Sequence, residues 1–404
     1  MDPIRNPYAP GAGSQPPELA GREALLDAAS VALDRVKAGR HERSFIAVGL
    51  RGVGKTVLLN RVRELAEARN YRLALIEARE DQPLPLLLLP HLRRLLLELD
   101  RLGQLSEVVK RALRVFKSFL TAIRLRQGDL ELVLDIDPER GSADSGQLDA
   151  DLPELFVALG RAAKDRGAAV LLLIDELQYI AEDELGALIM ALHRTAQESL
   201  PVLLVAAGLP QLVGQMGRSK SYAERLFAFP EIGALNDADA RRALAAPAAS
   251  AGISYTDEAL DEILAQTQGY PFFLQEWGYC AWNIARLSPI CRQDIDKATI
   301  EAIRKLDSSF FRVRFDRLTP RERDYLRAMA DLGDGPLRSG DIADRLGISV
   351  MTAGPLRGGL IRKGMIYSPA HGDTAFTVPL FGAFMRRSMP VWSPRAASKD
   401  RRKP

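Results

Sequence analysis

The chain has 404 residues, of which 47% are hydrophobic and 26% are charged, and its net charge is +3. This composition is ordinary for folded domains, excludes a disordered or fibrous chain, and leaves room for two or three domains. The charge is uneven, because residues 304–404 contain 20 Lys and Arg against 10 Asp and Glu. That excess predicts an anionic partner for the C-terminal third.

The sequence also limits the cell compartment and the metal sites that we expect. Two cysteines, Cys280 and Cys291, are too few for a disulfide framework, so we expect a reducing, cytoplasmic setting. The first 17 residues hold five prolines and no apolar core, and the apolar stretch 84–97 is broken by prolines and arginines. We therefore expect no secretory signal and no membrane span. The four histidines lack metal-ligand spacing, which predicts no zinc site.

The N-terminal half alternates helices with apolar strands. After a Pro/Gly-rich arm over residues 1–18, the sequence predicts helices over 21–37, 55–67, 84–99, 105–123, 152–164 and 183–199. Strands are predicted over 44–49, 71–77, 169–175 and 201–207, with a polar loop over 135–151. These strands lack polar alternation, which is typical of a parallel sheet covered by helices on both faces. The pattern predicts an α/β core over 19–232.

From residue 233 onward the pattern is helical. Asn236 and Thr256 are expected to cap two helices, and Pro271 to begin a third. This predicts a small helical domain over 233–303, followed by a linker over 304–318.

The last third begins with the clearest helix start in the chain. Thr319 and Glu322 flank Pro320 and Arg321 as a capping box. Ser339 and Ser349 are expected to cap two further helices, followed by a hairpin of 365–367 with 375–378. This order predicts a winged helix-turn-helix domain over 319–390, before a basic tail over 391–404.

A glycine-rich segment, residues 49–56, has the pattern Gly-x4-Gly-Lys-Thr between a predicted strand and a predicted helix. Glycines let successive N–H groups face a phosphate, Lys55 would neutralise β- and γ-phosphate charge, and the Thr56 hydroxyl would hold Mg²⁺. A purely structural strand-to-helix turn is the alternative. The predicted nucleotide-binding residues are Gly49, Gly52, Val53, Gly54, Lys55, Thr56 and Val57.

A second candidate element is the apolar run 171–174, which ends in Asp175 and Glu176. Ligands of parallel sheets bind at the carboxyl ends of the strands. Asp175 would orient Mg²⁺, and Glu176 would polarise the water that attacks the γ-phosphate, which predicts hydrolysis. Alternatively, these acids merely cap the following helix.

Together these motifs resemble the AAA+ ATPases of the origin-recognition and replication-initiator type, a group that overlaps the STAND signalling ATPases. The resemblance also covers Gly21-Arg22-Glu23, Gly269-Tyr270-Pro271 and the C-terminal winged helix. It implies a P-loop NTPase fold with a five-stranded parallel sheet, a helical lid, and ATP driving a conformational cycle. It also implies adenine contacts from Gly21 and Arg22 and lid contacts to the nucleotide from Tyr270 and Pro271. Considered apart from the family resemblance, Gly269 and Pro271 indicate only a helix boundary.

Two departures from this family point to a slow, switch-like ATPase. The strand over 202–208 ends without a polar residue, and the lid helix after Pro271 begins without an arginine. An arginine acting in cis or in trans is expected from Arg225 or Arg218. The absence of an Asn-Lys-x-Asp sequence favours ATP over GTP.

In a helix-turn-helix, the N-terminal part of the second helix reads base edges in the major groove. The sequence places Pro355 inside that helix, which would kink it or delay its start. The function predicted is a switch acting on duplex DNA; the alternative is a signalling scaffold that uses this domain for protein contacts or self-association. The candidate DNA contacts are Ser349, Thr352, Arg357, Arg362 and Lys363.

Overall fold

The computed structural model describes the chain except residues 12, 15, 81, 101–105, 128–135 and 395–404. The described residues form two compact units. The sheet unit comprises residues 21–49 and 54–233, and the helical unit comprises 1–20, 50–53 and 234–404. Most of the predicted basic tail and the expected starts of the helix at 105 and of the loop at 135 lie outside the described residues.

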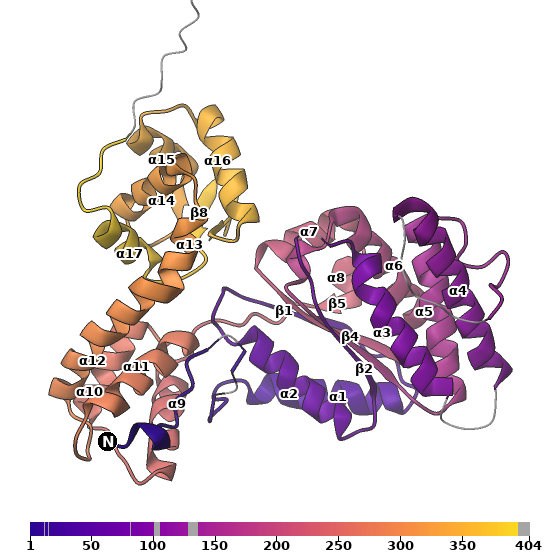
Figure 1. Cartoon of the computed structure of the whole chain (residues 1–404), viewed down its shortest axis with the longest axis horizontal. Helices are drawn as coiled ribbons and strands as arrows, with labels where there is room; N and C mark the ends of the chain where they lie inside the picture. The colour runs from indigo at the N-terminus through magenta and orange to yellow at the C-terminus, as the bar shows by residue number, and fades with distance from the viewer. Residues whose placement is uncertain (12, 15, 81, 101–105, 128–135, 395–404) are drawn as a thin grey trace, which may run out of the picture. The chain divides into compact units, whose positions relative to one another are not determined.

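The sheet unit contains a five-stranded sheet in the order β2-β3-β4-β1-β5 (Figure 1). All neighbouring strands are parallel, and Glu77 of β2 lies opposite Asp175 of β3. The predicted parallel sheet is therefore confirmed. The strands are β1 (Ser44–Val48), β2 (Arg72–Glu77), β3 (Val170–Asp175), β4 (Val202–Gly208) and β5 (Phe227–Ala228).

Helices cover both faces of this sheet, with α1 and α2 on one side and α3, α5 and α6 on the other (Figure 1). Ile46, Leu172 and Leu204 join the core beneath α3–α6 and are almost fully buried. Alternation turns their strand neighbours towards α1 and α2, so both faces are apolar. The helices are α1 (Glu23–Lys37), α2 (Lys55–Glu67), α3 (Leu84–Asp100), α4 (Glu107–Gln127), α5 (Leu148–Asp165), α6 (Glu182–Gln197), α7 (Gln211–Ser219), α8 (Ala223–Leu226) and the 3-10 helix η2 (Leu177–Tyr179).

Helix α5 begins at Leu148, four residues before the expected start, so the expectation of a loop reaching residue 151 was wrong. Asp149 and Asp151 lie in its first turn, where acids favour the positive end of the helix dipole. The buried carboxylate of Asp151 accepts the backbone N–H groups of Ser145 and Gly146, which fixes the chain entering the helix.

The helical unit includes the N-terminal arm, which packs on its helices. Tyr8 is buried; its hydroxyl donates to the carbonyl of Leu244, and its ring occupies the space where a Cβ on Gly278 would stand. Helices before residue 306 are α9 (Asp237–Ser250), α10 (Asp257–Thr267), α11 (Pro271–Ile284) and α12 (Arg292–Lys305), with the 3-10 helix η1 (Pro3–Arg5) in the arm. Asn236 and Thr256 cap α9 and α10 as predicted.

Residues 304–318, which the sequence predicts as a linker, are largely helical. A π-helical turn, η3 (Leu306–Phe311), continues α12 and leads into α13 (Arg312–Asp316). Phe310 stacks on Phe272, and Phe311 packs against Phe384. These aromatic contacts explain why the segment is ordered as helix, since they bury apolar rings against neighbouring helices.

The residues after 318 form a C-terminal module with helices α14 (Pro320–Leu332), α15 (Ser339–Leu346), α16 (Val350–Arg362) and α17 (Phe381–Ser388). Its antiparallel sheet has the order β6-β8-β7, formed by β6 (Leu337–Arg338), β7 (Ile366–Tyr367) and β8 (Asp373–Phe376). The predicted hairpin and the capping box of Thr319 and Glu322 are present. Within the described ranges, no helix combines the length and apolarity needed to cross a bilayer.

One predicted cap in this module was wrong. Ser339 is the first residue of α15, and its hydroxyl donates to the carbonyl of Gly372 instead of capping the helix. Ser349 does cap α16, because its side chain accepts the N–H of Thr352. The difference arises because β8 and its turn supply a carbonyl that the local sequence does not reveal.

Candidate functional site

The glycine loop (residues 49–56) and the acidic strand end (Asp175 and Glu176) lie where the strands of the sheet have their carboxyl ends. The loop follows the end of β1, Asp175 ends β3, and β4 is the parallel neighbour of both strands. Their carboxyl ends therefore meet at one edge, where nucleotides bind in open α/β sheets.

The loop conformation requires glycine at two positions. Gly52 has φ +84° and Gly54 has φ +93°, both in the left-handed region. No side chain caps the N-terminus of α2, which begins at Lys55. The N-terminus of a helix carries the positive end of the helix dipole, which favours an anion such as phosphate at this loop.

Lys55 is buried at the start of α2. Its ammonium donates to the carbonyl oxygen of Gly49 over 3.0 Å and so ties the two ends of the loop together. A buried ammonium needs anionic or polar partners nearby. Lys55 is therefore placed to neutralise phosphate held by the loop.

Thr56 and Asp175 contact each other directly: the Thr56 hydroxyl donates to Oδ2 of Asp175 over 2.6 Å. Oδ1 of the same carboxylate accepts the backbone N–H of Glu176 over 2.8 Å. Burial raises the pKa of Asp175, and these two hydrogen bonds oppose the rise. The described residues contain no group of three or more His, Cys, Asp and Glu able to hold a metal. A hydroxyl beside one carboxylate nevertheless fits Mg²⁺, which takes few protein ligands and completes its shell with phosphate and water.

Glu176 follows β3 in a left-handed conformation, with φ 54° and ψ 38°. This conformation is costly for a residue with a side chain and is often found at functional sites. Its Oε2 accepts a hydrogen bond from the side-chain amide of Gln178 in η2. Gln178 is not among the residues predicted from the sequence, where its one signal is a polar side chain next to Leu177, Tyr179 and Ile180.

Gly21 and Arg22 also lie at this edge. The Arg22 guanidinium donates to the carbonyl of Gly233 over 2.6 Å, and the neighbouring Ile232 donates its N–H to the carbonyl of Val48. Because Val48 ends β1 just before the glycine loop, Arg22 is near the loop, as a base contact requires.

In the helical unit, loop residues 50–53 contact the start of α11. The Tyr270 hydroxyl donates to the carbonyl of Arg51, and the N–H of Phe272 donates to the carbonyl of Gly52 over 3.2 Å. Burial raises the pKa of Tyr270 above its ordinary value. Pro271 occupies the first position of α11 between these two contacts.

Arg225 lies at the opposite end of the strands, near the residues where they begin. It precedes β5, whose first residue, Phe227, is paired with Ser44 at the start of β1. The expectation that Arg225 could act in cis was therefore wrong, since the loop leaves the other end of β1. Arg218 is an exposed residue that pairs with Glu182.

The five candidate DNA contacts fall into two groups. Ser349, Thr352 and Arg362 are exposed on α16. Arg357 instead bonds to Thr374 and Ser368 inside the module. Lys363 pairs with Glu322 over 2.7 Å. These two side chains hold the module together, which their position on a helix did not predict.

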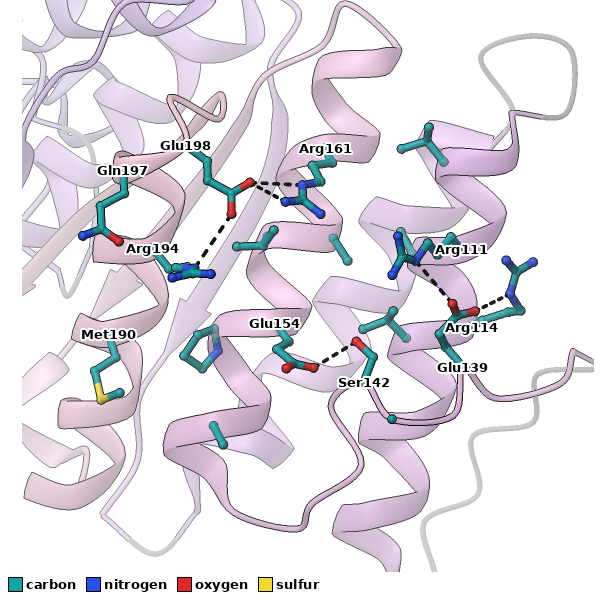
Figure 2. Close-up of a pocket in the computed structure, with 18 of the residues that line it drawn as sticks. Arg111, Arg114, Glu139, Ser142, Glu154, Arg161, Met190, Arg194, Gln197 and Glu198 are labelled. Carbon is teal, nitrogen blue, oxygen red and sulfur yellow. Dashed lines mark hydrogen bonds and ion pairs between the residues drawn. The ribbon is translucent and has the colours of Figure 1, made fainter.

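A groove of about 1020 Å³ runs along α4, α5 and α6, away from the glycine loop (Figure 2). Figure 2 shows ion pairs on its walls: Arg114 with Glu139 over 2.8 Å, and Arg161 with Glu198 over 2.7 Å. Ser142, which also lines the groove, donates to Glu154 over 2.9 Å. Because the arginines face carboxylates, this groove does not have the net positive charge that a triphosphate needs.

Two family models match the chain. Residues 18–205 match the AAA ATPase domain, a segment that includes the glycine loop and the acidic strand end. Residues 308–385 match a family described as Domain of unknown function (DUF8462). No curated protein matches the chain in sequence.

Solved structures are similar to the chain at low sequence identity. The chain is similar to a Walker-type ATPase of Pyrococcus abyssi, with 17% identity, 92% of this chain and 97% of that chain covered, and a TM-score of 0.53. Orc1 of Aeropyrum pernix, solved in complex with DNA, has 16% identity, coverage of 95% and 96%, and a TM-score of 0.48. Cdc6p from Pyrobaculum aerophilum has 15% identity, coverage of 96% and 98%, and a TM-score of 0.46. The match over residues 18–205, together with the parallel sheet and the glycine loop, identifies this segment as an AAA ATPase domain.

Proposed function

We propose that the chain is an ATP-driven switch whose nucleotide site is formed by the glycine loop, Asp175 and Glu176. The observation that carries this proposal is the hydrogen bond from Thr56 to Asp175, which joins the loop and the acidic strand end. Bound Mg²⁺ would neutralise phosphate charge and orient the β- and γ-phosphates. Thr56 and Asp175 would hold it, and Glu176 would accept a proton from the attacking water. The phosphates would contact Gly49, Gly52, Val53, Gly54, Lys55, Thr56 and Val57.

Further residues complete the proposed site. Gly21 and Arg22 would contact the base, supported by their place beside the end of β1. Tyr270 would sense the nucleotide through its hydrogen bond to Arg51, and Pro271 would contribute from its place between that bond and the one from Phe272 to Gly52. Arg225 would act only in trans, on the site of a second copy, which implies a homo-oligomer during hydrolysis. A slow rate is supported by the apolar end of β4 and by an α11 start without arginine.

We further propose the domain division 1–18, 19–232, 233–303, 304–318, 319–390 and 391–404, with residues 319–390 as a winged helix. The three-stranded sheet and the order of α14, α15 and α16 support it. Arg51 of the glycine loop approaches the module, since its Nη2 lies 2.6 Å from where a Cβ on Gly364 would stand, just before β7. A cytoplasmic location is inferred from the two free cysteines.

Duplex DNA is the proposed target of the module. The net positive charge of residues 304–404 supports it, as do the exposed side chains of Ser349, Thr352 and Arg362 along α16. Such binding would depend on phosphate contacts and fall steeply with salt.

A protein partner is the second candidate target. Val350 and Met351 at the start of α16 are 55% and 89% exposed, which leaves apolar surface open. Adjacent exposed apolar side chains favour protein contacts over phosphate contacts.

Fluorescence anisotropy of a labelled duplex with the full chain separates the two targets. We expect binding that weakens between about 50 and 200 mM salt and differs between ATP and ADP. Arg362→Glu should weaken binding about tenfold, whereas Arg5→Glu, with the same charge change at an exposed site in the arm, should have little effect. Salt-independent binding, or none, would favour the protein partner.

A further inference from the structure

The side chain of Gln178 joins two strands at the candidate site. Its Nε2 donates to Oε2 of Glu176, and its Oε1 accepts the backbone N–H of Leu209 over 3.0 Å. The orientation of the amide follows from chemistry, because a backbone N–H can only donate and must face the oxygen. The NH₂ group is therefore directed at the carboxylate of Glu176.

The backbone on either side supports this contact. Glu176 is turned into the left-handed region, and its N–H is held by Asp175. The two adjacent acids therefore have different partners: Asp175 is hydrogen-bonded to Thr56, whereas Glu176 is hydrogen-bonded to Gln178. A carboxylate has two oxygens with several acceptor sites, so the hydrogen bond from Gln178 does not in itself prevent Glu176 from accepting a proton.

The other end of the contact lies where β4 ends. Leu209 follows directly after β4, and Gly208 is the last residue of the strand. A Cβ on Gly208 would lie 2.9 Å from Oε1 of Gln178, so glycine permits the close approach of the amide. The end of β4 has no polar side chain of its own. Gln178 thus provides a polar connection from this strand to the acid.

We propose that Gln178 is a positioning residue for ATP hydrolysis, which holds the carboxylate of Glu176 towards the attacking water and links it to the end of β4. This inference rests on the proposed role of Glu176. Glutamate has a flexible side chain. If the carboxylate of Glu176 were not held in place, kcat would fall, because proton transfer requires a base within hydrogen-bond reach of the water.

The first test compares two glutamine-to-methionine variants. Gln178→Met keeps the length of the side chain and removes the amide; kcat should fall about tenfold or more while the Kd for ATP stays within about twofold. Gln215→Met is the matched control. Gln215 is also half-buried, and its amide donates to the carbonyl of Ile180, just after η2, so the variant loses one hydrogen bond without touching Glu176. Its kcat should be unchanged.

A second variant distinguishes positioning from a structural role. In Gln178→Glu, a protonated carboxyl can still donate to Glu176 and accept from Leu209, whereas an ionised one repels Glu176. Its kcat relative to that of the unaltered chain should therefore be highest at low pH and fall as pH rises. Gln178→Met should show a constant ratio across the same pH range.

The outcomes also separate this inference from the proposed site. If Gln178 acts through Glu176, the double variant with Glu176→Gln should be as slow as Glu176→Gln alone. Two results would overturn the inference while Glu176→Gln still showed its loss of kcat. One is a double variant whose loss of kcat is the product of the two single losses. The other is a Gln178→Met variant with the kcat of the unaltered chain. If Glu176→Gln itself hydrolyses ATP at the unaltered rate, the proposed site fails.

Discussion

Thr56 and Asp175 are 119 residues apart in the sequence, yet the hydroxyl of one donates to the carboxylate of the other over 2.6 Å. This bond joins the first turn of α2 to the end of β3 and fixes the geometry from which the site is built. Both oxygens of Asp175 are engaged, one by Thr56 and one by the backbone of Glu176. Mg²⁺ held there would contact the oxygens of Thr56 and Asp175, which already lie side by side.

Asp175→Asn should raise the melting temperature in the absence of nucleotide at pH 7. Burial raises the pKa of Asp175, so the folded chain binds its proton more readily than the unfolded chain does. The free energy of unfolding therefore falls as pH rises from the ordinary carboxyl value to the raised one, and the penalty persists above it. A neutral amide removes this penalty.

The melting temperature of the variant at pH 7 should therefore exceed that of the unaltered chain. Thermal melts between pH 4 and pH 8 check the sign, because the difference between the two proteins should shrink as pH falls. A gain that grows towards low pH would contradict the assignment of the penalty to Asp175.

Glu176→Gln should keep ATP affinity and lower kcat about 100-fold or more, because the amide cannot accept a proton from water. Steady-state phosphate release and a separate ATP titration measure the two quantities. Glu182→Gln is a suitable control, since Glu182 is an acid in the first turn of α6 that pairs with Arg218 on the surface. Equal losses in both variants would argue against a specific role for Glu176.

Gly52→Ala should weaken ATP binding and destabilise the chain. The residue has φ +84°, and an added Cβ would lie 3.1 Å from the Tyr270 ring and 3.2 Å from Cβ of Phe272. Gly39→Ala is matched in conformation, with φ +74°, but its Cβ would have no neighbour within 4 Å.

Both variants should lose about 1–2 kcal/mol from the left-handed conformation. Only Gly52→Ala should also change the Kd for ATP, measured by calorimetry. If Gly39→Ala weakened ATP binding equally, the contact with Tyr270 and Phe272 would not be the cause.

The elements that sequence predicted well are those set by local signals. The apolar strand before Asp175, the glycines at 52 and 54, and the capping box at Thr319 each fix their own conformation and were found where expected. Parallel pairing followed from strands without polar alternation, which placed the loop and Asp175 at one edge.

What sequence could not predict depends on partners distant in the chain. Arg357 looks like a surface residue of α16 but bonds across to Ser368 and Thr374. Ser339 has the composition of a cap, yet the carbonyl of Gly372 engages it. The role of Gln178 depends on Leu209, whose N–H comes from the residue directly after β4, 31 positions along the chain.

Isothermal titration of ATP with Mg²⁺ into the unaltered chain and into Lys55→Ala tests most directly whether a triphosphate binds at this loop. Lys55 is buried and tied to Gly49 at the start of α2, so its loss removes the cation nearest the proposed phosphates. We predict binding to the unaltered chain that becomes about 100-fold weaker or more in the variant, a loss of about 2.7 kcal/mol. Equal affinity in both proteins would contradict the proposed site.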